Sequence, residues 1–209
     1  MKILCIGDSL TEGDYGYKYQ RGVKNVHPEN YPYFLSKILG VETVNAGKCG
    51  FTPSKYLQYY QEGNVTAKGA DAVIILLGTN GGLDPDSETQ GNADYEKLVA
   101  CVRRDAPDAV VVICTPPHVT ENPALINCGY AERVKKAARW VLDYDRRRIV
   151  EMGETAKRGL IDLADTPMFT AENERIMQPN DGLHFGATGY LKMAEFIAER
   201  ISPYLKNKK

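Results

Sequence analysis

The chain opens with the segment Ile3-Leu4-Cys5-Ile6-Gly7-Asp8-Ser9-Leu10, and the order of residues within it decides the fold. Four apolar residues followed by a glycine predict a short buried strand that ends in a sharp turn. Strands buried on both faces are typical of parallel sheets covered by helices. Ligands bind outside the carboxyl ends of such strands, so Ser9 stands where a nucleophile is expected.

The rest of the chain alternates strand-like and helix-like segments. Apolar runs predict four further strands, at residues 41–45, 71–77, 109–114 and 160–163. Helix signals predict five helices, at 31–39, 53–61, 92–105, 130–157 and 187–204, the fourth of them with a break near Asp143. This alternation predicts one domain over residues 1–209, with a three-layer α/β/α fold around a doubly wound, five-stranded parallel sheet.

Long connections follow the predicted strands. They cover residues 10–30, 46–52, 78–91, 115–128 and 164–186. Loops of this length in a compact domain are usually functional. Because all five leave the carboxyl ends of parallel strands, they reach the same edge of the sheet and can converge on one site.

Composition argues against several function classes. A formal net charge of -1 gives no sign of the basic surface that nucleic-acid-binding proteins carry. The start of the chain lacks the pattern of a secretory signal, and no apolar run is long enough to span a membrane, so we expect a cytoplasmic protein without a membrane partner. The 5 cysteines are odd in number and show no C-x-x-C spacing, which predicts reduced thiols and no zinc site.

A serine hydroxyl is a poor nucleophile until a base, usually a histidine oriented by a carboxylate, accepts its proton. Of the histidines, His184 alone has a carboxylate three residues earlier, Asp181. A D-x-x-H turn can place both side chains on one side. His27 and His118 are interpreted as loop histidines with local hydrogen bonds, although the position of His118 after the fourth strand also allows it to line a pocket.

Acyl transfer also needs hydrogen-bond donors directed at the oxyanion. Two glycine-rich segments follow the second and third strands, Asn45-Ala46-Gly47-Lys48-Cys49-Gly50 and Gly78-Thr79-Asn80-Gly81-Gly82. The backbone N–H groups of Ser9 and Gly47 and the side-chain amide of Asn80 are the predicted donors. Taken alone, each segment is better explained as an ordinary turn. Their combination with Ser9, Asp181 and His184 favours a serine hydrolase.

With these segments in this order, the chain resembles the SGNH/GDSL hydrolases from residue 3 to about 195. The resemblance rests on Gly7-Asp8-Ser9-Leu10-Thr11-Glu12-Gly13, the two glycine-rich segments and Asp181-Gly182-Leu183-His184. It implies a flavodoxin-like SGNH hydrolase fold without a cofactor or metal. It also implies that Ser9 is the nucleophile, His184 the base and Asp181 its orienting carboxylate, with Ser9, Gly47 and Asn80 forming the oxyanion hole.

Two departures from the family pattern concern the surroundings of these residues. The position after the asparagine is often aspartate in the family and is Gly81 here, which leaves open how the Asn80 loop is braced. The histidine is often followed by proline and asparagine, whereas Phe185 and Gly186 follow here. Neither change removes a group to which the resemblance assigns a catalytic role.

The substrate is predicted from the loops around Ser9. Tyr15 and Tyr17 follow the serine closely and offer flat faces suited to a sugar, and Asp8 and His118 are further predicted contacts. Polar loops without a long apolar lid favour a small acyl group, such as acetyl on a carbohydrate. Three other hypotheses stay open. They are a lysophospholipase or thioesterase activity, a non-catalytic carbohydrate-binding domain on the same fold, and Cys49 as an alternative nucleophile.

Overall fold

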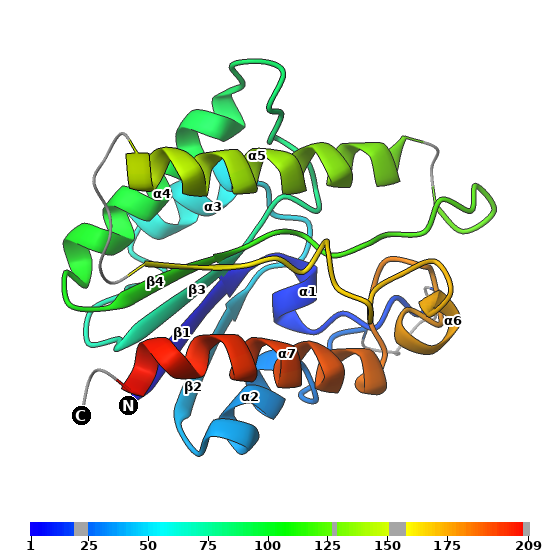
Figure 1. The fold of residues 1–209 in the computed structure, drawn as a ribbon, viewed down its shortest axis with the longest axis horizontal. Coiled ribbons are helices and arrows are strands. Elements are labelled where there is room, and N and C mark those ends of the chain that lie inside the picture. Colours follow the sequence, from blue (N-terminus) through cyan, green and yellow to red (C-terminus); the bar gives the residue numbers. More distant parts are fainter. Residues whose placement is uncertain (19–24, 127–128, 151–157, 207–209) are drawn as a thin grey trace.

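The computed structural model describes residues 1–18, 25–126, 129–150 and 158–206. One parallel sheet forms its centre, with strand order β2-β1-β3-β4-β5 (Figure 1). The strands are β1 (Lys2–Gly7), β2 (Glu42–Gly47), β3 (Ala72–Leu76), β4 (Val110–Cys114) and β5 (Arg158–Ile161). This architecture confirms the predicted α/β fold class.

Helices cover both faces of the sheet. They are α1 (Ser9–Glu12), α2 (Tyr31–Leu39), α3 (Pro53–Gln61), α4 (Gln90–Asp105), α5 (Tyr130–Val150), α6 (Glu174–Met177) and α7 (Ala187–Lys206). Figure 1 shows α2 and α7 on one face and α3, α4 and α5 on the other. Within the described residues, no helix combines the length and apolar character needed to cross a bilayer.

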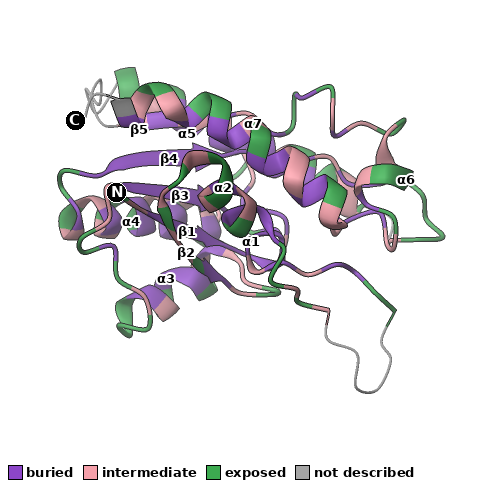
Figure 2. Ribbon diagram, turned by 90° about the horizontal axis from the view of Figure 1, so that it is seen from below, coloured by how far each residue is buried: buried purple, intermediate pink, exposed green. Residues whose placement is uncertain are grey.

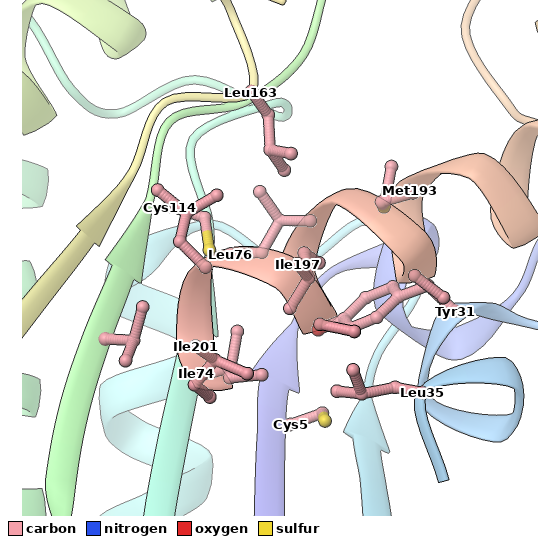
Figure 3. Close-up of a cluster of buried hydrophobic side chains, with 14 of the residues drawn as sticks. Cys5, Tyr31, Leu35, Ile74, Leu76, Cys114, Leu163, Met193, Ile197 and Ile201 are labelled. Carbon is pink, nitrogen blue, oxygen red and sulfur yellow. The ribbon is translucent and has the colours of Figure 1, made fainter. Parts of the chain in front are cut away.

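The core has one layer on each side of the sheet because successive strand residues point to opposite faces. On β1, Ile3 and Cys5 pack towards α2 and α7, whereas Leu4 and Ile6 pack towards α3, α4 and α5. Figure 3 shows the first layer, with Leu35 of α2 and Ile197 of α7 among its side chains. The central strands are buried and the outer helix faces exposed (Figure 2).

Strand register places the candidate site. Gly47, Gly7, Leu76, Cys114 and Ile161 form one row across the sheet near the strand ends. The connections after the strands therefore start at a common edge. In the order β2-β1-β3-β4-β5, the switch point lies between β1 and β3, which is where ligands bind in such sheets.

Helix α5 differs from its prediction. It continues without a break through Asp143, which pairs with Arg146 at 3.2 Å on the same helix. Trp140 and Tyr144 stack one turn apart with an interplanar angle of 17°, and both are buried. This buried aromatic pair fixes the turn where the break was expected. The remainder of the predicted helix, residues 151–157, lies outside the described residues.

Candidate active site

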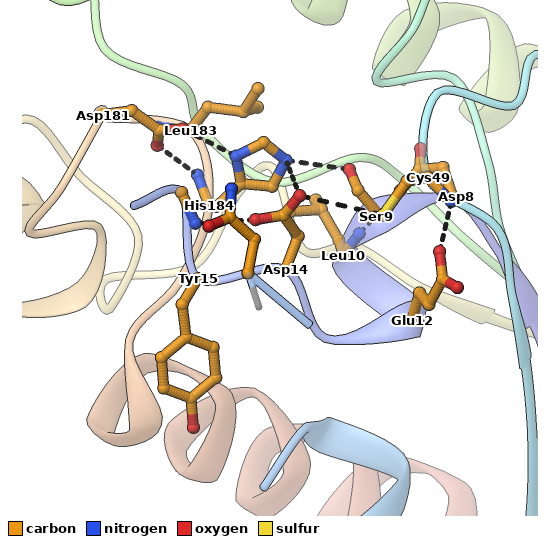
Figure 4. A network of polar contacts seen from close by, with 12 residues as sticks. Asp8, Ser9, Leu10, Glu12, Asp14, Tyr15, Cys49, Asp181, Leu183 and His184 are labelled. Atoms are coloured by element: carbon orange, nitrogen blue, oxygen red, sulfur yellow. Dashed lines mark hydrogen bonds and ion pairs between the residues drawn. The ribbon is translucent and has the colours of Figure 1, made fainter. Parts of the chain in front are cut away.

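The side chains of Ser9, His184 and Asp181 meet at the carboxyl edge of the sheet (Figure 4). His184 Nε2 lies 2.9 Å from the Ser9 hydroxyl oxygen, and His184 Nδ1 lies 2.7 Å from Asp181 Oδ2. These residues are separated by up to 175 positions in sequence. The contacts form a continuous hydrogen-bonded chain from carboxylate to imidazole to hydroxyl, which is the arrangement that activates a serine.

Ser9 owes its position to the turn between β1 and α1. Asp8 caps the short helix by accepting the Leu10 N–H at 3.0 Å. Gly7 is required because a Cβ there would collide with the Thr11 side chain. Asp8 is 0% exposed, so the predicted contact between Asp8 and substrate is wrong. Burial raises the pKa of its carboxyl to about 6, against the lowering effect of the Leu10 N–H.

A compact turn holds His184 and Asp181 in place. Asp181 Oδ1 accepts the backbone N–H groups of Leu183 and His184, at 3.0 and 2.8 Å. Gly182 adopts φ 70°, and a Cβ at this residue would collide with the Thr120 side chain. The Thr120 N–H also donates to the Gly182 carbonyl at 2.8 Å. The segment after β4 therefore supports the turn that carries Asp181 and His184.

A second carboxylate, that of Asp14, approaches the imidazole of His184. Asp14 Oδ2 lies 4.0 Å from His184 Nε2, on the side of the ring that faces Ser9. Burial disfavours the charged imidazole, but Asp181 and Asp14 outweigh it and raise the pKa of His184. The pKa of Asp181 is lowered, because its bonds to His184 and Leu183 outweigh the effect of burial.

The backbone at Gly47 is arranged differently from the prediction. Its N–H donates to Asn45 Oδ1 at 2.9 Å, so it is not a free oxyanion donor, and a Cβ there would collide with the backbone at Glu12. Gly50 instead is exposed, and its N–H has no hydrogen-bond partner among the described residues. The preceding Cys49 donates its own N–H to the Glu12 carboxylate at 2.5 Å, which anchors this segment beside α1.

The amide of Asn80 is held at both ends. Its Nδ2 donates to the Phe51 carbonyl at 3.1 Å, and its Oδ1 accepts from the Tyr130 hydroxyl at 3.3 Å. An amide nitrogen carries two N–H groups. The second N–H of Asn80 has no partner in the described part of the chain, as is also true of the Ser9 backbone N–H.

The structure gives different results for the other three predicted substrate contacts, Tyr15, His118 and Tyr17. Tyr15 is 7% exposed and packs between His27 and Tyr190. Its ring points away from Ser9 (Figure 4), so this prediction is wrong. His118 Nε2 faces the Glu174 carboxylate at 3.6 Å, a distance too long for a hydrogen bond, and its side chain is 18% exposed. Tyr17 is 39% exposed and stays available, with its ring against Tyr15 and His27.

Sequence reasoning missed two neighbours of the site. Asp14 lies five residues after Ser9, and this proximity together with its charge was a usable signal. Tyr130 is 50 positions from Asn80, and nothing in the sequence links the two. The described residues contain no group of three or more His, Cys, Asp or Glu side chains arranged to hold a metal ion.

Comparisons with known proteins were made for both the sequence and the fold. No curated protein matches the sequence. Among solved structures, a lipase/acylhydrolase from Enterococcus faecalis is 21% identical with TM-score 0.67, covering 97% of this chain and 95% of that one. A carbohydrate acetylesterase family member from Sinorhizobium meliloti is 21% identical with TM-score 0.67, covering 98% and 99%. The native aryl esterase of M. smegmatis is 19% identical with TM-score 0.65, covering 97% and 99%.

These structural similarities establish the fold, and the family follows from the sequence itself. The model of the GDSL-like lipase/acylhydrolase family matches residues 5–192. The matched range includes the segment Gly7–Gly13, both glycine-rich segments and the Asp181–His184 turn. The chain therefore belongs to the GDSL-like lipase/acylhydrolase family and is a carboxylic ester hydrolase.

Proposed function

We propose that the protein is a serine esterase that removes small acyl groups, above all acetyl, through an acyl-enzyme formed on Ser9. The observation that carries this proposal is the hydrogen-bonded chain Ser9–His184–Asp181, with distances of 2.9 and 2.7 Å. His184 Nε2 accepts the Ser9 proton as the serine oxygen attacks the ester carbonyl carbon. Asp181 holds the Nδ1–H tautomer and stabilises the imidazolium that forms.

The rest of the cycle uses the same groups. The tetrahedral intermediate expels the alcohol oxygen, which takes the proton from His184 Nε2 and leaves as the free alcohol. Ser9 then carries the acyl group. A water molecule gives its proton to His184 and attacks the acyl carbon, and collapse of the second intermediate returns the proton to Ser9 and releases the carboxylic acid.

Three donors serve the oxyanion in this proposal. They are the Ser9 N–H, the second amide N–H of Asn80 and the Gly50 N–H, which replaces Gly47. Support comes from their lack of hydrogen-bond partners among the described residues, whereas the Gly47 N–H is engaged by Asn45. Preorganised donors of this kind are typically the largest single contribution to acyl-transfer catalysis.

The acyl group and alcohol are assigned from the site's surroundings. Asp14 approaches His184 Nε2, the Tyr130 hydroxyl binds the Asn80 amide, and Glu12 binds the Cys49 N–H. The groups beside these residues are polar, which suits a short acyl chain and a hydroxyl-rich alcohol. The similar fold of a carbohydrate acetylesterase family member from Sinorhizobium meliloti supports the same substrate class. We therefore propose an acetylated carbohydrate as substrate.

Two measurements test this function. Ser9→Ala should abolish turnover of p-nitrophenyl acetate while leaving the thermal unfolding midpoint near that of the wild type, and activity that survives would refute the triad. A chain-length series of p-nitrophenyl esters, run beside a panel of acetylated sugars, tests the substrate. A preference for long acyl chains would favour a lysophospholipase or thioesterase activity instead.

A non-catalytic carbohydrate-binding domain is the alternative from another class. It predicts that a fluorophosphonate probe fails to label Ser9, because no base would activate the hydroxyl. The esterase predicts stoichiometric labelling of Ser9 that is lost in His184→Ala. Peptide mapping of the labelled protein separates the two outcomes.

A further inference from the structure

The side chain of Asn80 has no support from the residue that follows it. Gly81 carries no side chain and adopts φ 87°. The contacts that fix the Asn80 amide come instead from two other segments, Phe51 before α3 and Tyr130 at the start of α5. The brace for this amide therefore depends on tertiary structure rather than on its own loop.

These two contacts determine which way the amide points. The Phe51 carbonyl can only accept a hydrogen bond, so the Asn80 atom that faces it at 3.1 Å must be the nitrogen. The oxygen is then the atom 3.3 Å from the Tyr130 hydroxyl, which must donate. Rotating the amide by 180° would place two acceptors against each other at Phe51. With both contacts in place, the second N–H of Asn80 has one fixed direction.

Tyr130 is itself held in place. The Arg133 guanidinium lies 4.3 Å from the centre of its ring, a cation–π contact between residues one helical turn apart. Arg133 reaches this position because Gly81 leaves room, since a Cβ on Gly81 would lie 2.9 Å from the Arg133 Cδ. Arg133 makes no ion pair with any described residue, so no carboxylate competes with the Tyr130 ring for its guanidinium.

Tyr130 also contacts the segment that carries the base. Its ring packs against the small cluster of Val119, Val134 and Leu183, and Leu183 directly precedes His184. Burial, and then the Asp8 carboxylate, raise the pKa of the Tyr130 hydroxyl to about 12. The hydroxyl therefore keeps its proton, and remains a donor, at any pH at which an esterase is assayed.

We propose that Tyr130 is a positioning residue, which fixes the Asn80 amide so that its second N–H is directed at the oxyanion. Arg133 supports it by covering the ring, in space that Gly81 leaves open. The proposal rests on the oxyanion role given to Asn80 above. Tyr130 acts through Asn80 and contributes to the transition state rather than to binding of the ester.

The test is a double-mutant cycle between Tyr130→Phe and Asn80→Ala, measured with p-nitrophenyl acetate. Phe keeps the ring and removes the donor, so kcat should fall about 3- to 10-fold, the range expected for one hydrogen bond. KM should stay within about twofold, because the contact acts on the transition state. In the Asn80→Ala background, Tyr130→Phe should change kcat by less than about twofold, since no amide remains to be positioned.

Tyr33→Phe is the matched control. Tyr33 is 40% exposed on α2 and is also covered by a basic side chain one turn later, Lys37, but its hydroxyl has no hydrogen-bond partner among the described residues. This variant should leave both kcat and KM unchanged. Thermal unfolding of each variant reports whether it is folded under the assay conditions.

Each other outcome is decisive. A Tyr130→Phe variant with wild-type kcat refutes the positioning role, and so does an equal loss of kcat in the wild-type and Asn80→Ala backgrounds. Asn80→Ala alone should lower kcat about 10²- to 10³-fold. If it costs less than about tenfold, the oxyanion role of Asn80 fails first, and the role of Tyr130 fails with it.

Discussion

Oδ2 of Asp14 lies 4.0 Å from Nε2 of His184, the same nitrogen that faces the Ser9 hydroxyl at 2.9 Å. Oδ1 of Asp14 accepts the Gly16 N–H at 2.8 Å, which fixes the carboxylate in this orientation. Asp181 binds the opposite side of the ring. The imidazolium formed when Ser9 gives up its proton is therefore flanked by two negative charges, which favour the charged form.

This flanking predicts the pH dependence of the enzyme. His184 must be neutral to act as a base, and its pKa is raised above about 6.5, the ordinary histidine value. As pH is lowered, kcat/KM should therefore begin to fall at a higher pH than it would with an ordinary histidine. Asp14→Asn removes one of the charges that hold this pKa up. The acid limb should then move to lower pH, measured from pH–rate profiles with a neutral ester.

The control for this shift is Asp143→Asn, which removes a surface carboxylate paired with Arg146 on α5. Its acid limb should coincide with that of the wild type. If Asp14→Asn leaves the limb in place, or moves it to higher pH, Asp14 does not stabilise the charged imidazole.

Gly182 gives a prediction about the turn that holds the base. Gly182→Ala would push a Cβ into the Thr120 side chain and displace the turn. Displacements of about 1 Å at a catalytic group can cost about 10² in rate, so kcat should fall at least tenfold. Gly40→Ala is the control, because Gly40 also has a positive φ, 64°, but open space around its Cβ. It should lose stability, by about 1 kcal/mol, and keep its kcat.

A second substitution separates crowding from backbone strain. Thr120→Ser removes the methyl group nearest to the added Cβ while keeping the hydroxyl that donates to Glu174. Combined with Gly182→Ala, it should recover part of the lost kcat. The absence of any recovery would mean that the Thr120 methyl group is not what displaces the turn.

Sequence patterns predicted the fold well wherever a local signal sets an element. Helices α2 and α3 have the expected bounds because Asn30 and Thr52 cap their first turns and Gly40 ends α2. The break predicted in α5 near Asp143 was wrong, because stacking between two buried aromatic side chains outweighs the local polarity of the sequence. The short helices α1 and α6 carry too few residues to show a period.

The site divides in a similar way. The order of Ser9, Asn80 and His184 along strand ends is a property of topology, so their convergence could be inferred from sequence. The direction in which a single N–H group points could not be inferred from the sequence. Gly47 is engaged by Asn45 two residues earlier, and this depends on the backbone path of the turn. The contact between Tyr130 and Asn80 spans 50 positions and follows only from how α5 packs.

Asp8 predicts how stability depends on pH. Its folded pKa is raised by burial to about 6, from 3.8 when solvated, so the folded state binds the proton more tightly than the unfolded chain. The contribution of Asp8 to stability should therefore fall as pH rises from about 4 to about 6, by about 3 kcal/mol, and then level off. Asp8→Asn keeps an oxygen to cap Leu10 and removes the buried charge.

The measurement is the difference in free energy of unfolding between Asp8→Asn and the wild type at several pH values. The variant should gain relative to the wild type between pH 4 and 6. Asp71→Asn, at a partly exposed carboxylate near the opposite end of β1, is the control for removal of a carboxylate elsewhere. A constant difference across the range would mean that Asp8 titrates alike in both states.

Cys49 gives the last prediction, because it is an exposed residue close to Ser9. Its Sγ lies 3.7 Å from Asp14 Oδ2, and its backbone N–H binds the Glu12 carboxylate. Partial burial and these two carboxylates raise the pKa of the thiol. Since the thiolate is the reactive form, Cys49 should alkylate slowly with iodoacetamide at pH 7.5 despite its exposure, and Asp14→Asn should speed the reaction. Cys49→Ser should retain most of the esterase activity, whereas loss comparable to that in Ser9→Ala would make Cys49 the nucleophile.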